Sequence, residues 1–340
     1  MGQTLLSDLH PALHGRICVR ALITGVTGFA GSHLAEMLVS QNDEVIGVAR
    51  HPRATLDWLQ NRITLVFADL QHPGVVRDLL DHHRPDVVYH LAGQAFVPLS
   101  WRDPWDTLQN NIRPQLNLLQ SLVDLKLDTR LLVVTSNQVY GHVTQSDLPV
   151  AEDAPFRPDN PYGVSKAAQD LLGLQYFQSH GVNVLRARPF NHIGPRQSPM
   201  FVAASFARQI ARIEAGLSEP VIKVGNLEAR RDFTDVVDVV RAYTLLARHG
   251  QPGEAYNIGV GRAYSIQYLL DTLLSFTTRS IEVCPDADRM RPADVPVIYA
   301  DNRKLREATG WKPTISFEDS LLRVLEYWRS ETQQSLKTHS

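Results

Sequence analysis

Short apolar segments alternate with longer segments of helical periodicity over the first 190 residues of the chain. The short segments have the length of buried strands, and the longer ones repeat apolar residues every three to four positions, as helices do. Strands are predicted at residues 18–24, 44–49, 63–67, 86–90, 131–135 and 182–188. Strands that alternate with helices pair in parallel, and helices cover both faces of their sheet. The pattern therefore predicts an α/β fold with a doubly wound parallel sheet.

The pattern loosens after Pro189, where prolines and glycines become frequent. The elements predicted in this part are helices at 202–215 and 236–248 and a strand at 221–224. A smaller C-terminal α/β lobe is the simplest explanation. We therefore divide the chain into a leader, 1–17, a first domain, 18–190 with 233–260 returning to it, and the smaller lobe, 191–232 and 261–335.

Three glycines lie at the junction of the first predicted strand and the first predicted helix. Glycine permits a tight turn and a close backbone approach, and the N-terminus of the helix presents N–H groups to a phosphate. Spaced glycines alone are weak evidence, but at this junction they indicate a Rossmann-type dinucleotide site. The predicted contacts are Gly25, Thr27, Gly28, Phe29, Ala30 and Gly31.

Arg50 follows the second predicted strand. NAD sites usually carry a carboxylate here for the ribose 2′-hydroxyl, whereas an arginine accommodates the 2′-phosphate of NADP. Arg50, with Arg53 as a second candidate, therefore favours NADP(H) over NAD(H). A solvated surface arginine is the alternative interpretation.

Tyr162 and Lys166 are four residues apart in a helical segment, so their side chains share one face. Ser136 follows the fifth predicted strand, and parallel-sheet enzymes gather their chemistry at the carboxyl ends of strands. Reduction of a ketone needs a proton donor, and a neighbouring ammonium lowers the pKa of a tyrosine. We predict that Tyr162 is the general acid–base and that Lys166 lowers its pKa and binds the nicotinamide ribose. Ser136 is predicted to bind the substrate carbonyl.

Composition narrows the class of protein. The formal net charge of −2 argues against a nucleic-acid binder, and no apolar run approaches the ~20 residues that cross a bilayer. The histidines lack the cysteine partners and spacing of a zinc site, so no metal is predicted. Two cysteines cannot form a disulfide framework, and Cys18, in an apolar run, is predicted to be a buried thiol. These features and the absence of a secretory signal in the first twenty residues predict a cytoplasmic protein.

These motifs, with glycine spacing GxxGxxG, resemble the extended short-chain dehydrogenase/reductase family over residues 18–330. The resemblance implies further cofactor contacts from Asp69 and Leu70, from Leu91, Ala92 and Gly93, and from His192. Its two-fold dimers imply that the helices near 104–125 and 161–178 pair with their copies in a homodimer.

Three segments resemble the branch of this family that acts on nucleotide sugars, and within it the members that process GDP-mannose. They read RPFNHIGP at 188–195, GNLEARRDF at 225–233 and RPAD at 291–294. Arginines bind a diphosphate bidentately, and a carboxylate suits ribose hydroxyls. The substrate contacts that the resemblance implies are Ser136, Asn137, Asn191, Val202, Arg231, Arg291 and Asp294.

Within these members the same segments resemble the NADPH-dependent reductases of the 4-keto group of GDP-4-dehydro-6-deoxy-D-mannose. These enzymes form GDP-6-deoxy-D-mannose, which is GDP-D-rhamnose. A nucleotide-sugar 4-epimerase, a reductase that forms GDP-6-deoxytalose and a non-catalytic NADP-sensing regulator stay open as alternatives. A 3,5-epimerase-reductase needs a cysteine beside the fifth strand, which this sequence lacks.

The chain also resembles the dehydratases of this family, and those enzymes carry carboxyl groups at the positions of Asn137 and Gln138. An amide does not titrate near neutral pH and cannot act as general acid or base. Hydride transfer at C4 needs neither carboxylate. The sequence therefore predicts a reductase that cannot dehydrate GDP-mannose.

Overall fold

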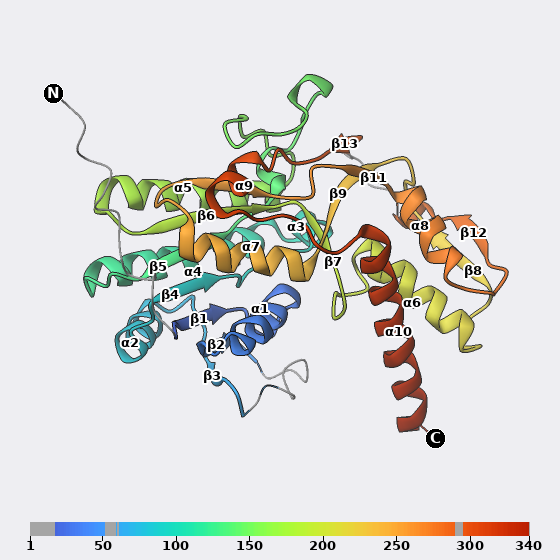
Figure 1. Ribbon diagram of the computed structural model, residues 1–340, viewed down its shortest axis with the longest axis horizontal. Coiled ribbons are helices and arrows are strands. Elements are labelled where there is room, and N and C mark those ends of the chain that lie inside the picture. The colour runs from blue at the N-terminus through green and yellow to red at the C-terminus, as the bar shows by residue number, and fades with distance from the viewer. Residues whose placement is uncertain (1–17, 52–58, 60, 290–294, 340) are drawn as a thin grey trace.

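The computed structural model describes residues 18–51, 59, 61–289 and 295–339. Its elements are arranged as two layered parts, a large sheet with helices on both faces and a smaller lobe that carries the C-terminus (Figure 1). The predicted leader, together with Arg53, Arg291 and Asp294, lies outside the described residues.

Seven parallel strands form the central sheet in the order β10-β6-β5-β4-β1-β2-β3. They are β1 (Arg20–Thr24), β2 (Glu44–Ala49), β3 (Thr64–Phe67), β4 (Val87–His90), β5 (Arg130–Val134), β6 (Val184–Pro189) and β10 (Ala255–Ile258). The order reverses between β1 and β4, so the carboxyl ends of these two strands flank a crevice where such sheets bind ligands. The predicted doubly wound parallel sheet is confirmed.

Alternating side chains in the strands feed two separate cores. Ile23 packs with helices α1 (Phe29–Ser40) and α7 (Val236–His249), and its neighbour Leu22 packs on the opposite face. The opposite face is covered by α2 (Pro73–His83), α4 (Pro104–Asp124) and α5 (Pro161–His180) (Figure 1). Because both faces are buried, the strands read as continuous apolar runs, which made them visible in the sequence.

The smaller lobe is built from short strands around a separate core. One sheet contains β7 (Asn191–Ile193), β9 (Arg230–Asp235), β11 (Ala263–Ser265) and β13 (Val297–Ile298), and a second pairs β8 (Val221–Val224) with β12 (Glu282–Pro285). Helices α6 (Val202–Glu214), α8 (Ile266–Ser275) and α10 (Phe317–His339) pack beside them (Figure 1). The remaining helices are α3 (Val97–Arg102) and α9 (Arg303–Thr309).

The bounds predicted for β2 and β8 agree with the structure. The prediction for Cys18 is wrong, because β1 begins only at Arg20 and the Cys18 side chain is exposed. An apolar run does not reveal where its strand begins.

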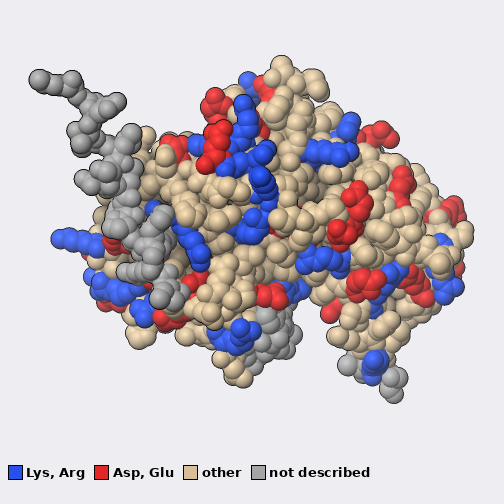
Figure 2. All heavy atoms as spheres, in the orientation of Figure 1, with Lys and Arg blue, Asp and Glu red and all other residues tan. Residues whose placement is uncertain are grey.

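Acidic and basic side chains are interspersed over the face of the molecule in Figure 2. This mixture is what the near-zero net charge leads one to expect. Within the described ranges, no helix combines the length and apolar character that a membrane span requires.

Candidate active site

The glycine loop joins β1 to α1 with its backbone in close contact with neighbouring strand ends. Gly25 has a φ of +72°, and a Cβ there would lie 2.9 Å from the backbone nitrogen of Ala92. A Cβ on Gly31 would lie 2.3 Å from the carbonyl oxygen of Gly25. Gly28 is the N-cap of α1 and provides no side-chain hydrogen bond to the first N–H groups of the helix. A phosphate group fits this cradle.

Arg50 lies at the carboxyl end of β2, beside α4. Its Nη1 donates to Asn110 Oδ1 at 3.2 Å, and Gln71 Nε2 donates to the same oxygen at 2.9 Å. Asp69 accepts from the backbone nitrogen of Gln71, and the backbone oxygen of Leu70 accepts from buried Asn117 on α4. The predicted cofactor residues after β2 and β3 thus lie along one edge, held by amides of α4.

The segment after β4 connects this edge to the catalytic helix. Ala92 donates its backbone N–H to Thr24 Oγ1 at 3.1 Å. A Cβ on Gly93 would lie 2.7 Å from Asn111 Oδ1 and 3.8 Å from Lys166 Nζ. Leu91, Ala92 and Gly93 therefore lie between the glycine loop and Lys166.

The three predicted catalytic residues come together at the end of β5. Ser136 begins the 3-10 turn η2 (Asn137–Val139), and Tyr162 and Lys166 lie on the first two turns of α5. Ser136 lies close enough to Tyr162 to act on the pKa of its hydroxyl, and Lys166 Nζ lies 5.9 Å from the Tyr162 ring centre. Lys166 also donates to the backbone oxygen of Val134 at 3.0 Å. All three side chains are buried.

Burial dominates the protonation of this group. It raises the pKa of Tyr162 to about 12, while the hydrogen bond with Ser136 acts in the opposite direction. It also lowers the pKa of Lys166 to about 7. The predicted lowering of the Tyr162 pKa by Lys166 is not found in the structure, because burial of Tyr162 raises that pKa. The spacing of two residues in the sequence carries no information on their burial. At pH 7 Tyr162 is protonated, which is the form that donates a proton.

An amide on α4 supports the catalytic helix, and sequence reasoning missed it. Asn111 Nδ2 donates to Ser165 Oγ at 2.8 Å and to the backbone oxygen of Gln94 at 3.1 Å. Its Oδ1 accepts from the backbone nitrogen of Gln94 at 2.7 Å. Asn111 therefore joins α5 to the segment after β4. Its partners lie 17 and 54 residues away, so no local motif marks it.

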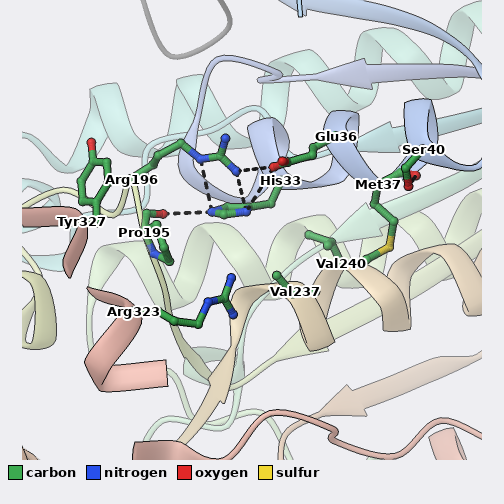
Figure 3. A pocket seen from close by; sticks show the side chains of 10 residues that line it. All are labelled: His33, Glu36, Met37, Ser40, Pro195, Arg196, Val237, Val240, Arg323 and Tyr327. Atoms are coloured by element: carbon green, nitrogen blue, oxygen red, sulfur yellow. Dashed lines mark hydrogen bonds and ion pairs between the residues drawn. The ribbon is translucent and has the colours of Figure 1, made fainter. Parts of the chain in front are cut away.

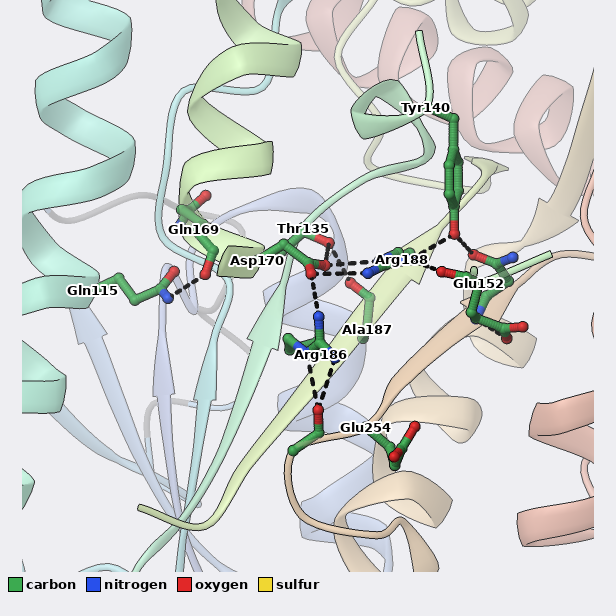
Figure 4. A network of polar contacts seen from close by, with 12 residues as sticks. Gln115, Thr135, Tyr140, Glu152, Gln169, Asp170, Arg186, Ala187, Arg188 and Glu254 are labelled. Atoms are coloured by element: carbon green, nitrogen blue, oxygen red, sulfur yellow. Dashed lines mark hydrogen bonds and ion pairs between the residues drawn. The ribbon is translucent and has the colours of Figure 1, made fainter. Parts of the chain in front are cut away.

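A buried ionic network anchors the same helix to the sheet (Figure 4). Asp170, one turn after Lys166, accepts from Arg186 at 2.6 Å and from Arg188 at 2.7 and 2.9 Å. Thr135, the neighbour of Ser136, also donates to it at 3.4 Å. Removing one member leaves uncompensated buried charge, so the network keeps α5, β5 and β6 in one arrangement.

The predicted substrate residues of the lobe lie on short strands and at one helix start. Asn191, a predicted substrate residue, and His192, a predicted cofactor residue, are in β7, which pairs in parallel with β9, the strand that contains Arg231. Val202 is the first residue of α6, and the preceding Phe201 contacts Phe96 of the large domain. The His192 ring stacks on Phe29 of the glycine loop, with centroids 5.5 Å apart. The lobe thus meets the glycine loop at β7.

Asn137, a predicted substrate residue, directly follows Ser136 in the sequence. Its Oδ1 accepts from Ser136 Oγ at 3.3 Å. Its Nδ2 is buried and has no hydrogen-bond partner among the described residues. A buried donor of this kind fits an oxygen of a bound ligand.

A cavity of about 610 Å³ lies elsewhere, between α1, α7, α10 and the segment after β7 (Figure 3). None of its lining residues is a predicted site residue. They are His33, Glu36, Met37, Ser40, Pro195, Arg196, Val237, Val240, Arg323 and Tyr327. Arg196 pairs with Glu36 at 2.9 Å, and His33 Nε2 lies 2.9 Å from the Pro195 oxygen. These contacts hold the segment after β7 against α1. The predicted catalytic residues lie at the strand ends and not in this cavity.

The described residues hold no group of three or more His, Cys, Asp and Glu side chains arranged to bind a metal ion.

Comparison with known proteins identifies the family. The family described as GDP-mannose 4,6 dehydratase matches residues 22–324. The chain belongs to the GDP-mannose 4,6-dehydratase family. This result confirms the extended short-chain dehydrogenase/reductase family and the nucleotide-sugar branch predicted from the motifs.

Two relatives whose names give different activities are similar to the chain. GDP-6-deoxy-D-mannose reductase of Pseudomonas aeruginosa is 40% identical over 93% of this chain and 99% of its own length. GDP-mannose 4,6 dehydratase 2 of Arabidopsis thaliana is 30% identical over 88% of this chain and 83% of its own.

Solved structures agree in fold. That of RMD from Pseudomonas aeruginosa complexed with NADPH has a TM-score of 0.81 and 39% identity, covering 92% of this chain and 99% of that one. That of UDP-glucose 4-epimerase from Thermotoga maritima with UDP-glucose has a TM-score of 0.82 and 28% identity, with the same coverage.

Proposed function

We propose that this protein is an NADPH-dependent reductase that converts the 4-keto group of GDP-4-dehydro-6-deoxy-D-mannose to the alcohol of GDP-6-deoxy-D-mannose. One observation carries the choice within the family. Beside the Ser136–Tyr162 pair, both side chains of the η2 turn that precede Val139 are amides, Asn137 and Gln138. A site with amides there supports reduction, and elimination of water lacks its acid and base. The likeness to the Pseudomonas aeruginosa reductase supports the same choice.

One residue of the site donates the proton, and the others bind the substrate and the cofactor. Tyr162, protonated at neutral pH, donates its proton to the oxygen that develops negative charge at C4. Ser136, which lies beside Tyr162, holds that oxygen, and the buried donor Asn137 Nδ2 binds a neighbouring sugar oxygen. NADPH supplies the hydride when bound. The glycine cradle suits its pyrophosphate, and Arg50 suits its 2′-phosphate.

The test is a coupled reaction. GDP-mannose is first converted by a separate 4,6-dehydratase, and the protein is then added with NADPH. We expect NADPH oxidation and a 6-deoxy sugar nucleotide whose C4 configuration NMR identifies as manno. A product with the talo configuration at C4 would mean that the protein is a reductase that forms the C4 epimer, GDP-6-deoxytalose. Formation of the 4-keto sugar from GDP-mannose and NADP⁺ by this protein alone would contradict the proposal.

We also infer a cytoplasmic homodimer that uses α4 and α5. Large apolar side chains are exposed at the start of α4, in the middle of α5 and on the adjacent α3: Trp105 is 72% exposed, Leu171 55% and Trp101 58%. Apolar side chains on two adjacent helices suit a self-complementary two-fold contact. Light scattering should give twice the chain mass, and Trp105→Glu should give a monomer. A wild-type monomer at micromolar concentration would contradict the dimer.

A further inference from the structure

The side chain of Asn160 joins the catalytic helix to the turn after β5. Asn160 is the N-cap of α5, and its Oδ1 accepts from the backbone nitrogen of Gly163 at 2.8 Å. Its Nδ2 donates to Gln138 Oε1 at 3.0 Å and to Asp159 Oδ1 at 2.7 Å. Asn160 itself is 8% exposed. One buried amide therefore contacts both halves of the catalytic group.

These contacts determine which way each amide points. A backbone N–H can only donate, so the Asn160 atom that faces Gly163 must be oxygen. The other atom is then the nitrogen, as its contact with the Asp159 carboxylate also requires. A nitrogen there can only donate, so Gln138 must turn its oxygen toward it. The Nε2 group of Gln138 consequently points away from Asn160, and it is a donor.

The two segments are also in close packing contact. A Cβ on Gly163 would lie 2.7 Å from the backbone oxygen of Gln138. The backbone nitrogen of Gln138 donates to Ser136 Oγ at 3.2 Å. The position of Gln138 is thereby coupled to Ser136 on one side and to the first turn of α5, with Tyr162, on the other.

We propose that Gln138 Nε2 donates a hydrogen bond to an oxygen of the substrate sugar, and that Asn160 is the positioning residue that sets this polarity. Asn160 acts through Gln138 and does not contact the reacting atoms. Gln138 is partly exposed beside the buried Ser136 and Tyr162, as a side chain that reaches a ligand from the wall of the site must be. The proposal rests on the proposed reductase function.

A double-mutant cycle tests it. Asn160→Ser keeps a helix-capping oxygen but is too short to reach Gln138. Gln138→Met keeps the length of the side chain without its polar atoms. Each single change should lower kcat/KM for the 4-keto sugar about 3- to 10-fold, as the loss of one hydrogen bond does. The double variant should match Gln138→Met alone to within about twofold, because both changes remove the same interaction.

A second variant makes the prediction sharper. In an Asp159→Asn background, which removes the carboxylate that the Asn160 amide contacts, Asn160→Asp keeps the cap but presents only acceptor atoms. Gln138 should then turn its nitrogen toward the new carboxylate and offer its oxygen to the sugar. Activity should fall more than in Asn160→Ser. Adding Gln138→Met to Asn160→Asp should then raise kcat/KM about threefold or more, since it removes the wrongly oriented acceptor. Ser316→Ala, which changes the start of α10 in the lobe, is the matched control for altered capping and should leave activity unchanged.

The outcomes separate the two levels of the argument. If Asn160→Ser lowers kcat/KM by the same factor in the wild-type protein and in the Gln138→Met variant, Asn160 only caps the helix. That result would overturn the inference. Equal affinity of all variants for GDP-mannose by calorimetry, together with unchanged kcat/KM, would also overturn it. If the wild-type protein binds GDP-mannose but never turns over the 4-keto sugar, the reductase function fails. The same double-mutant cycle, measured as affinity for GDP-mannose, then still decides the role of Asn160.

Discussion

The proposed cofactor end of the large sheet and the proposed sugar-facing lobe are built differently. At the cofactor end the backbone forms the site: Gly25 and Gly31 lie against neighbouring main-chain atoms at the ends of long-range parallel strands. In the lobe, the proposed site residues lie on three- to six-residue strands, as with Arg231 of β9, which donates to the backbone oxygen of Val295 just before β13. The first kind of site is sensitive to added volume, and the second to lost charge.

The catalytic group shares features of both kinds of site, because it combines strand-end geometry with specific side chains. It should therefore give the largest single effect. Tyr162→Phe keeps the ring but removes the proton donor, and kcat should fall by a factor on the order of 10²–10⁴ with little change in NADPH affinity. Tyr268→Phe, at an exposed tyrosine of α8, is the control and should keep wild-type turnover. Turnover of Tyr162→Phe near wild type would remove Tyr162 from the mechanism.

Added volume should break the backbone-built site. In Gly31→Ala the new methyl group meets the Gly25 carbonyl, so the loop must shift and NADPH should bind about 100-fold more weakly. In Gly74→Ala the new methyl group meets nothing within 4 Å, so that variant should bind NADPH normally. Fluorescence titration measures both affinities, and melting temperatures show whether each variant folds. Equal affinities would mean that the loop does not hold the cofactor.

Lost charge should affect the side-chain-built site. Arg231→Ala should raise KM for the GDP-linked substrate roughly 10- to 50-fold, the effect of losing a charged hydrogen bond, and leave NADPH affinity intact. Its neighbour Arg230, which is exposed, supplies the control variant Arg230→Ala. A loss of NADPH affinity in Arg231→Ala would show that the two sites are not separate.

The cofactor end contains one charge-dependent contact of its own. Arg50→Ala should weaken NADPH about tenfold and NADH by less than twofold, because only NADPH carries the 2′-phosphate and an exposed charge contributes modestly. The ratio of the two dissociation constants is the measurement. If both cofactors weaken equally, Arg50 has a structural role through Asn110.

A buried lysine should make stability depend on pH. Burial lowers the pKa of Lys166 from 10.5 to about 7, so the folded protein releases this proton at lower pH than the unfolded chain. Stability is then lowest below about pH 7, where the buried group is charged, and rises toward pH 10.5. Lys166→Met should raise the melting temperature by a few degrees at pH 6 and by less at pH 9. A variant that melts below wild type at pH 6 would contradict this account.

The sheet could be predicted because both its faces are buried, and β2 was located to the residue. Ser136, Tyr162 and Lys166 could be named because strand ends and helix spacing act over short stretches of sequence. Asn160 and Asn111 could not, since their partners lie 22 and 54 residues away. The protonation of Tyr162 depends on burial, which no spacing reports. The three-residue strands β7 and β11 are too short to show any alternation.

The Asp170 network also limits how this chain can be recombined with its relatives. One carboxylate serves two arginines, and Arg188 continues to the Tyr140 hydroxyl, which in turn donates to Asn257. A crossover inside residues 135–188 can pair an arginine from one parent with a shorter or neutral partner from the other, leaving a buried cation unmatched. Chimeric reductases made by exchanging sugar lobes should therefore take 135–188 from a single parent and match position 257 to it. Crossovers before Thr135 leave the network whole and are the better starting points for design.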